Sequence, residues 1–351
     1  MNEKAEDLAF GRWPDILQAR GMDASFFSGR NGPCPFCGGS DRYRWAGKKF
    51  GGVWVCSSCT EGKYSSGMSM LMKHMGYSEF RAACDDVREF FGANKHIQPL
   101  PRAAREAAVQ EWTPEKIERN RARMLKFWNE ARPYTAGDPV DLYLKSRVPG
   151  LDHQLENLRF HPNLEYWLPP APGQDRFTLL GKFPAMLAYA QGPDGSLVQL
   201  HKTYLTDDGH KADVPNAKKT DLGVGLNSFA IRMMQPIGDT LGVSEGIETG
   251  IAGALLRGIP VWPCLNGGTM SEFVLPDELR GVIRKLVIFA DYDELKPKGR
   301  NADGSQRMWR PGVHYAETLA QKARAQGLRP LIIRSAKAGD DVADYWKKQA
   351  A

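Results

Sequence analysis

Two apolar runs that each end in acidic residues constrain the last third of the sequence. Residues 240–244 are followed by Glu245 and then by a small-residue amphipathic segment that predicts a helix. Residues 285–290 are followed by Asp291 and Asp293. Parallel strands joined by a crossover helix bring such acids together, because ligand sites in open α/β sheets lie at the carboxyl ends of the strands. This stretch therefore predicts a Rossmann-like parallel sheet.

A third apolar run, residues 330–334, precedes a loop that is also acidic. Acids that converge at one sheet edge repel one another unless a cation neutralises them, and carboxylate oxygens suit Mg²⁺ or Mn²⁺. The predicted ligands for this metal are Glu245, Asp291, Asp293, Asp341 and Asp344. The last two lie at a predicted helix start, where an aspartate is also a good cap.

Four of the six cysteines form two CxxC pairs separated by 18 residues. Four thiolates at this spacing can close a tetrahedral zinc site, and in a reducing compartment they favour metal over disulfides. We therefore expect one structural Zn²⁺ held by Cys34, Cys37, Cys56 and Cys59. Arg42 to Trp45 and Val53 to Val55 are predicted to form two strands of this zinc ribbon.

Basic and aromatic side chains alternate between the two cysteine pairs. Such a mixture suits contact with phosphates and stacking on bases. It is equally compatible with a solvated face whose aromatic side chains pack underneath. The candidate contacts to nucleic acid in this segment are Arg42, Arg44 and Trp45, with Lys48, Lys49 and Phe50 further along the same hairpin.

Composition bounds the remaining possibilities. A length of 351 residues suggests two or three domains, and a net charge of +6 permits nucleic-acid binding without establishing it. There is no run of 18 apolar residues and the N-terminus lacks an apolar signal core, so we expect a cytoplasmic protein with no membrane partner. The sequence contains no GxxxxGK[ST] motif, so it does not predict a P-loop ATPase.

The middle of the chain combines helices with a basic region of short strands. Residues 114–131 and 139–146 predict helices, and residues 150–235 carry alternating segments separated by turn signals. Its candidate contacts to nucleotide phosphates or template are Lys202, Lys211, Lys218 and Lys219, although a generic polar hairpin would look similar. Proline, alanine and charge in residues 93–113 predict a linker.

The motifs together resemble a known family, the DnaG-like primases of phages and mobile elements. CPFCGG and CSSC are similar to the zinc ribbon of phage and plasmid primase-helicases, and Glu245-Gly246, Asp291-Tyr292-Asp293 and the 340–344 loop resemble a Toprim domain. The implied fold is α/β and α+β multidomain. The implied domains are a zinc ribbon with flanking helices (1–92), a linker (93–113), a helical and basic α+β region (114–236) and a catalytic Toprim domain (237–351).

The resemblance also implies an activity. Such primases are DNA-directed RNA polymerases, nucleotidyltransferases that make short RNA primers from nucleoside triphosphates on single-stranded DNA with two divalent metals. On that pattern Asp291 and Asp293 hold the metals, and Glu245 is a metal ligand or a general base for the primer 3′-hydroxyl. Mg²⁺ or Mn²⁺ is then the catalytic cofactor, and a separate replicative helicase is the expected partner.

Two departures from the family pattern bear on the metal site. Replicative primases usually carry an acid four residues after the Toprim glutamate, where this chain has Thr249, and Glu248 is the nearest substitute. A basic insert, residues 294–310, interrupts the usual DxDxxG run before Pro311 and Gly312, and its length predicts a mobile loop.

Other Toprim functions are the alternatives. A Toprim nuclease would use the same acids, whereas a topoisomerase needs a strand-cleaving tyrosine on a further domain. A RecR-like protein combines a zinc site with a non-catalytic Toprim surface that binds DNA or protein. The retained acids, Glu245, Asp291, Asp293 and Asp341, argue against this last alternative, because a binding surface gains nothing from clustered repulsive charge.

Overall fold

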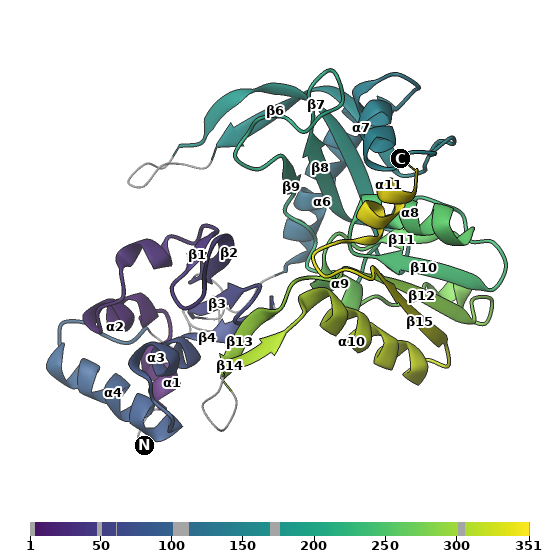
Figure 1. Cartoon of the computed structure of the whole chain (residues 1–351). Coiled ribbons are helices and arrows are strands. Elements are labelled where there is room, and N and C mark those ends of the chain that lie inside the picture. The colour runs from purple at the N-terminus through teal and green to yellow at the C-terminus, as the bar shows by residue number, and fades with distance from the viewer. Residues whose placement is uncertain are drawn as a thin grey trace. The chain divides into compact units, whose positions relative to one another are not determined.

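A computed structural model describes residues 4–47, 51–60, 62–100, 112–168, 176–300 and 306–350 of the chain. It contains two compact units (Figure 1). The first comprises residues 1–113 and 296–309, and the second comprises residues 114–295 and 310–351. Part of the predicted linker, residues 93–113, lies outside the described residues. Lys48, Lys49 and Phe50 also lie outside them.

The first unit is a small antiparallel sheet flanked by helices. The sheet has the order β1 (Gly32–Cys34), β2 (Gly38–Ala46), β3 (Val53–Cys56), β4 (Ser65–Ser66). The helical elements are α1 (Ala5–Ala9), α2 (Trp13–Ala19), η1 (Ala24–Phe27), α3 (Gly67–Met75) and α4 (Phe80–Ala93). The two ribbon strands expected from the sequence are confirmed as parts of β2 and β3.

Aromatic side chains fill the core of this unit. Trp45 and Trp54 face each other across β2 and β3 and are only 3% and 2% exposed. Gly67 lies against the ring of Trp13, and a Cβ atom there would come within 2.3 Å of it. The aromatic residues of the ribbon therefore pack underneath it, which is the second of the two interpretations left open above.

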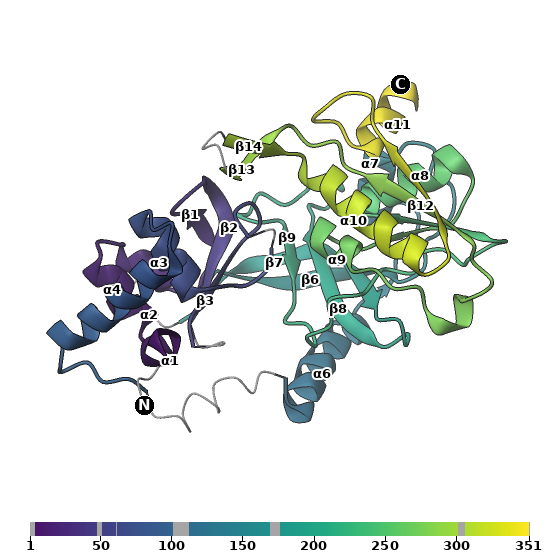
Figure 2. The same cartoon turned by 90° about the horizontal axis from the view of Figure 1, so that it is seen from below.

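The second unit begins with an antiparallel sheet covered on both faces. Its order is β5 (Arg132–Pro133), β6 (Leu158–Leu168), β7 (Thr178–Gln191), β8 (Leu197–Tyr204), β9 (Lys218–Thr220). Helix α6 (Pro114–Glu130) packs on one face, beside β8 (Figure 2), and its Met124 belongs to the same core as Leu187 of β7. Helix α7 (Pro139–Arg147) packs on the other face, where Leu144 joins the core that contains Met186.

A four-stranded parallel sheet completes the second unit. Its order is β11 (Val261–Pro263), β10 (Thr240–Ser244), β12 (Lys285–Ala290), β15 (Arg329–Arg334). Helices α8 (Ile247–Arg257) and α11 (Val342–Ala350) cover one face, and α9 (Gly267–Ser271) and α10 (Pro311–Ala325) the other (Figure 1). A short 3-10 helix, η2 (Asp277–Leu279), precedes β12.

Buried strands explain this layering. In β12, Val287 and Phe289 belong to the core under α8 and α11, whereas Leu286, Ile288 and Ala290 belong to the core under α10. Apolar residues on both faces are what a parallel sheet between two helix layers requires. The predicted α/β and α+β multidomain fold, with a Rossmann-like parallel sheet, is therefore confirmed. Within the described residues, no helix is long and apolar enough to span a bilayer.

The insert after Asp293 differs from the prediction. Residues 296–300 and 306–309 form the antiparallel strands β13 (Lys296–Arg300) and β14 (Gln306–Trp309), not a loop, and Lys296 pairs with Trp309. Sequence patterns do not predict this hairpin, because its strands are basic and polar and lack the apolar alternation of a half-buried strand. The hairpin belongs to the first compact unit, although its two ends are joined to the second.

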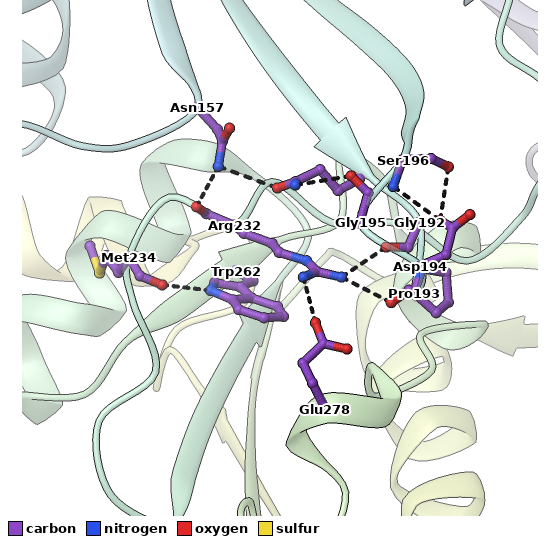
Figure 3. A network of polar contacts seen from close by, with 11 residues as sticks. Asn157, Gly192, Pro193, Asp194, Gly195, Ser196, Arg232, Met234, Trp262 and Glu278 are labelled. Atoms are coloured by element: carbon purple, nitrogen blue, oxygen red, sulfur yellow. Dashed lines mark hydrogen bonds and ion pairs between the residues drawn. The ribbon is translucent and has the colours of Figure 1, made fainter.

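An arginine fastens the β7–β8 turn to the parallel sheet (Figure 3). The guanidinium of Arg232 donates to the carbonyl oxygens of Gly192 and Pro193 at 2.9 and 3.1 Å and to Glu278 Oε1 at 2.9 Å. It also lies over the ring of Trp262 in β11. These contacts connect the antiparallel sheet to the parallel sheet. They join the backbone carbonyl groups of the β7–β8 turn, through Arg232, to the side chains of Glu278 and Trp262.

Replacing Arg232 with methionine is expected to destabilise the protein by about 2 kcal/mol, since two turn carbonyls lose a charged donor. Thermal unfolding of the full chain would measure this loss as a lower midpoint. Glu278→Gln is the matched control, because Glu278 is exposed and its ion pair with Arg232 contributes little. An unchanged midpoint for Arg232→Met would contradict the fastening role.

Candidate functional site

The four predicted zinc ligands come together in the first unit. All four sulfur atoms lie within 4.8 Å of one another, with Cys34 Sγ 3.8 Å from Cys59 Sγ and Cys37 Sγ 3.6 Å from Cys56 Sγ. A tetrahedral site with Zn–S bonds of about 2.3 Å needs sulfur atoms about 3.8 Å apart. The donor set and its spacing therefore fit a structural Zn²⁺.

The predicted acids lie at the carboxyl ends of three parallel strands in the second unit. Glu245 follows β10, Asp291 and Asp293 follow β12, and Asp341 lies on the loop between β15 and α11. We call these four residues the acid cluster. Among the described residues, only the four cysteines bring three or more metal-ligating atoms within 4.8 Å of one another. The carboxylates of the acid cluster are therefore spaced more widely than the thiols of the zinc site.

Asp291 is at the electrostatic centre of the acid cluster. Burial, followed by four neighbouring negative charges, raises the pKa of Asp291 to about 8. Those charges are on Glu245, Asp341, Asp293 and Glu248. Asp291 Oδ1 is buried and has no hydrogen-bond partner. An unpartnered buried carboxylate oxygen among like charges is a position that a divalent cation would stabilise.

The loop that follows Asp291 is closed by the start of α10. The backbone N–H of Gly312 donates to Asp293 Oδ2 at 2.8 Å, and the backbone of Asp291 leaves no room for a side chain at Gly312. Tyr292 lies between the guanidinium groups of Arg310 and Arg334, at 4.6 and 4.0 Å from its ring centre. Gly312 thus resumes the acidic loop after the inserted hairpin.

The last two predicted acids bond to each other's backbone. Asp341 precedes α11, and its Oδ1 accepts a hydrogen bond at 2.8 Å from the N–H of Asp344, whose Oδ2 accepts at 3.4 Å from the N–H of Asp341. This reciprocal pattern caps the helix. Burial raises the pKa of Asp341, so its charge is disfavoured at this position as at Asp291.

A basic group lies beside the acids. Lys218 Nζ in β9 is 2.8 Å from Glu248 Oε1 in α8, and the hydroxyl of Tyr143 in α7 donates to the same oxygen. Burial alone would raise the pKa of Glu248, but the charge of Lys218 and these hydrogen bonds outweigh it and lower that pKa to about 2. Glu248 therefore stays charged where the two sheets meet.

Two further cations and a histidine surround this pair. Burial lowers the pKa of Lys211, and the charges of Lys218 and Arg147 add to the effect. Burial and the charge of Lys218 lower the pKa of His201 to about 4, so this imidazole is neutral at pH 7. We call Arg147, Lys211 and Lys218 the basic group. Sequence reasoning had selected Lys211 and Lys218 but missed Arg147 and Tyr143, which lie in a helix with no local motif.

The structure argues against two predicted contacts to nucleic acid, because it buries their side chains. Lys202 is 7% exposed, pairs with Asp221 at 2.8 Å and lies over the ring of Phe127, so it fastens α6 to the sheet. Trp45 is 3% exposed in the ribbon core and cannot stack on a base. Period-two alternation along β2 directs Trp45 inward, whereas β8 is buried on both faces, so Lys202 is covered on the face under α6.

The other predicted contacts keep solvent access. Arg44 is exposed on β2 and donates to the hydroxyl of Tyr64 at 3.1 Å, and Arg42 is partly exposed on the same strand. Lys219 is partly exposed, donates to the carbonyl of Trp167 at 2.8 Å and lies over the ring of Tyr166. A role in binding DNA or nucleotide stays a prediction for these three residues.

Replacing Cys56 with serine is expected to remove the zinc and unfold the ribbon, because metal binding contributes most of the folding free energy of a site this small. Elemental analysis of the purified chain would then give a zinc content near zero. Cys84→Ser is the matched control, since Cys84 lies in α4 outside the cluster and its loss should leave the zinc in place. Full zinc content in Cys56→Ser would contradict the assignment.

Replacing Asp291 with asparagine should stabilise the divalent-free protein, and more so at high pH. The folded pKa of about 8 exceeds the ordinary value of 3.8, so ionisation of Asp291 destabilises the folded state increasingly from about pH 4 to about pH 8. We expect an unfolding midpoint several degrees above wild type at pH 8 and a smaller increase at pH 5. A difference that does not grow with pH would contradict the buried, crowded charge.

Family models match two parts of the chain. Residues 29–68 match the zinc-binding domain of primase-helicase, and residues 118–230 match a domain of unknown function designated DUF7146. The second match covers α6, α7 and the antiparallel sheet, and its description assigns no activity.

Several solved structures of primases are similar to this chain at low sequence identity. The zinc-binding and RNA polymerase domains of the Aquifex aeolicus primase match at 12% identity over 99% of this chain and 83% of that one, with a TM-score of 0.38. The primase fragment of the bacteriophage T7 primase-helicase matches at 12% identity over 91% and 94%, with a TM-score of 0.35.

The catalytic domain of a DnaG primase bound to single-stranded DNA matches at 12% identity over 67% of this chain and 79% of that one, with a TM-score of 0.39. TM-scores below 0.5 do not establish a common fold. The resemblance to zinc-ribbon primases is confirmed for residues 29–68, which match the zinc-binding domain of primase-helicase.

Proposed function

We propose that this protein is a DNA primase of the DnaG-like type, which synthesises short RNA primers on single-stranded DNA during replication of a phage, plasmid or integrative element. The observation that carries the proposal is the acid cluster at the ends of parallel strands, directly beside the basic group. It occurs in a chain whose N-terminal domain matches the zinc-binding domain of primase-helicases.

The catalytic domain in this proposal is a Toprim domain built on the parallel sheet. Asp291 and Asp293 would hold Mg²⁺ or Mn²⁺, with Glu245, Asp341 and Asp344 as further ligands. The unpartnered Oδ1 of Asp291 and the all-carboxylate donor set support this assignment. Bound divalent ions supply stabilisation of the attacking and leaving oxygens in an in-line displacement.

The side chains of this chain would then divide the work of nucleotidyl transfer. The primer 3′-hydroxyl attacks the α-phosphorus of the incoming nucleotide, its proton passes to a base such as Glu245, and diphosphate leaves with the electrons of the broken P–O bond. Lys211 and Lys218 would hold the triphosphate by charge. Two sets of contacts keep the acidic loop in place. The ring of Tyr292 contacts the guanidinium groups of Arg310 and Arg334, and the N–H of Gly312 donates to Asp293.

The template would contact the exposed basic side chains of the ribbon. Arg42 and Arg44 lie on β2, where their positive charge suits phosphate groups, and Lys219 provides a further contact on β9. A separate replicative helicase would supply the single-stranded DNA. Because phosphate contacts release counterions, binding of the template should weaken steeply with salt.

Primer synthesis tests the proposal directly. Labelled nucleotides and mixed-sequence single-stranded DNA are incubated with Mg²⁺ or Mn²⁺ and the full chain, wild type beside Asp291→Asn and Asp293→Asn. We expect short products from wild type and a loss of at least about 100-fold in each variant, since both remove charge that acts at the transition state. Asp277→Asn is the matched control, because Asp277 is exposed in η2 away from the site.

The other outcomes identify the alternatives. Binding of single-stranded DNA without synthesis, and without dependence on divalent metal, would replace the proposal with a RecR-like binding protein. Shortened template would replace it with a Toprim nuclease. Synthesis retained in Asp291→Asn would remove Asp291 from the metal site.

A further inference from the structure

Glu248 occupies a position between the acid cluster and the basic group. It lies in the first turn of α8, three residues after Glu245, and its side chain is buried with 6% of the residue exposed. Oε1 accepts hydrogen bonds from both Lys218 and Tyr143, so this oxygen is already committed. The residue is thus a buried carboxylate that neutralises a cation of the basic group.

Glu248 also acts on the acid cluster. Its negative charge is one of the four that raise the pKa of Asp291. A buried carboxylate next to other carboxylates increases their mutual repulsion and so their demand for a cation. One side chain therefore lowers the positive charge of the basic group and raises the negative potential of the acid cluster.

The surroundings of Lys218 contain polar atoms without partners. His201 Nδ1, Thr203 Oγ1 and Arg147 Nε are buried and make no hydrogen bond. Thr203 pairs with Lys218 across β8 and β9, and His201, nine-tenths buried, lies two residues earlier on the same face of β8. Unsatisfied buried polar groups are costly, so their presence beside a lysine is consistent with a site that receives a polar ligand.

We propose that Glu248 makes binding of the nucleoside triphosphate conditional on the divalent cation. The inference rests on the proposed function, since it concerns the same triphosphate and metal. Without metal, a triphosphate meets the acid cluster and a Lys218 whose charge is already paired. With metal, the acid cluster is neutralised, and a phosphate oxygen replaces Glu248 as the partner of Lys218.

This assignment differs from a role for Glu248 as a metal ligand in place of the acid missing at Thr249. Oε1 of Glu248 accepts hydrogen bonds from both Lys218 and Tyr143, and pairing with Lys218 is the role that these contacts support. Glu248 is instead a specificity-determining residue that discriminates metal-bound from metal-free nucleotide. The two roles predict opposite effects of removing its charge.

Equilibrium binding distinguishes them. The probe is a fluorescent, non-hydrolysable ATP analogue, titrated with the full chain in metal-depleted buffer that contains no chelator, so that zinc is retained, and again with saturating Mg²⁺. For wild type we expect binding only with Mg²⁺. For Glu248→Gln, which keeps the shape and a hydrogen bond to Tyr143, we expect metal-free affinity to rise about tenfold or more, because Lys218 becomes available.

Two variants separate charge from structure. Tyr143→Phe removes a hydrogen bond to the same oxygen but keeps the charge, so its dependence on Mg²⁺ should equal that of wild type. The double variant Glu248→Gln/Lys218→Met should lose the metal-free gain, because no cation is released. Far-UV circular dichroism and thermal unfolding establish that each variant is folded before its affinity is compared.

Three results would overturn the inference. Unchanged or weaker metal-free binding in folded Glu248→Gln would show that Glu248 does not oppose the triphosphate. Loss of Mn²⁺ binding in that variant to the same extent as in Asp291→Asn, measured by electron paramagnetic resonance of free Mn²⁺, would make Glu248 a metal ligand. Wild type that binds no triphosphate even with Mg²⁺ or Mn²⁺ would remove the proposed function, and this inference with it.

Discussion

Repulsion among carboxylates at one sheet edge is the constraint on which the rest of the second unit depends. Parallel strands deliver Glu245, Asp291 and the 341–344 loop to the same edge, where burial and like charge raise the pKa of Asp291. Such an arrangement is costly to fold without a cation, and the stability of the surrounding packing must offset that cost. Two helix layers and a core shared with the antiparallel sheet provide this stability.

The junction between the two sheets decides which charges meet. Lys218 comes from a short edge strand and Glu248 from a helix of the other sheet, and Tyr143 from α7 completes their contact. Arg232 fastens the same two sheets at the β7–β8 turn. Since both contacts involve charged or buried polar groups, a shift of one sheet against the other would leave several of them unpaired.

Local patterns were sufficient for most elements of the chain. The strands at 240–244 and 285–290 and the helix from Pro114 have the predicted positions, because apolar runs and a proline at the helix start act within a few residues. The hairpin at 296–309 was missed, since its strands are polar and basic. Lys202 and Trp45 were assigned to nucleic acid because residue type alone does not reveal the direction of a side chain.

The sequence by itself determined the zinc ligands, the parallel strands and the acids at their ends, because each depends on spacing or alternation along the chain. Only the tertiary structure decided which cations stand beside those acids. The sequence separates Arg147 from Glu248 by 101 positions, with Lys218 between them, and no local periodicity relates the three residues. Their meeting is set by how α7, α8 and β9 pack, which is a property of the folded core and not of any single segment.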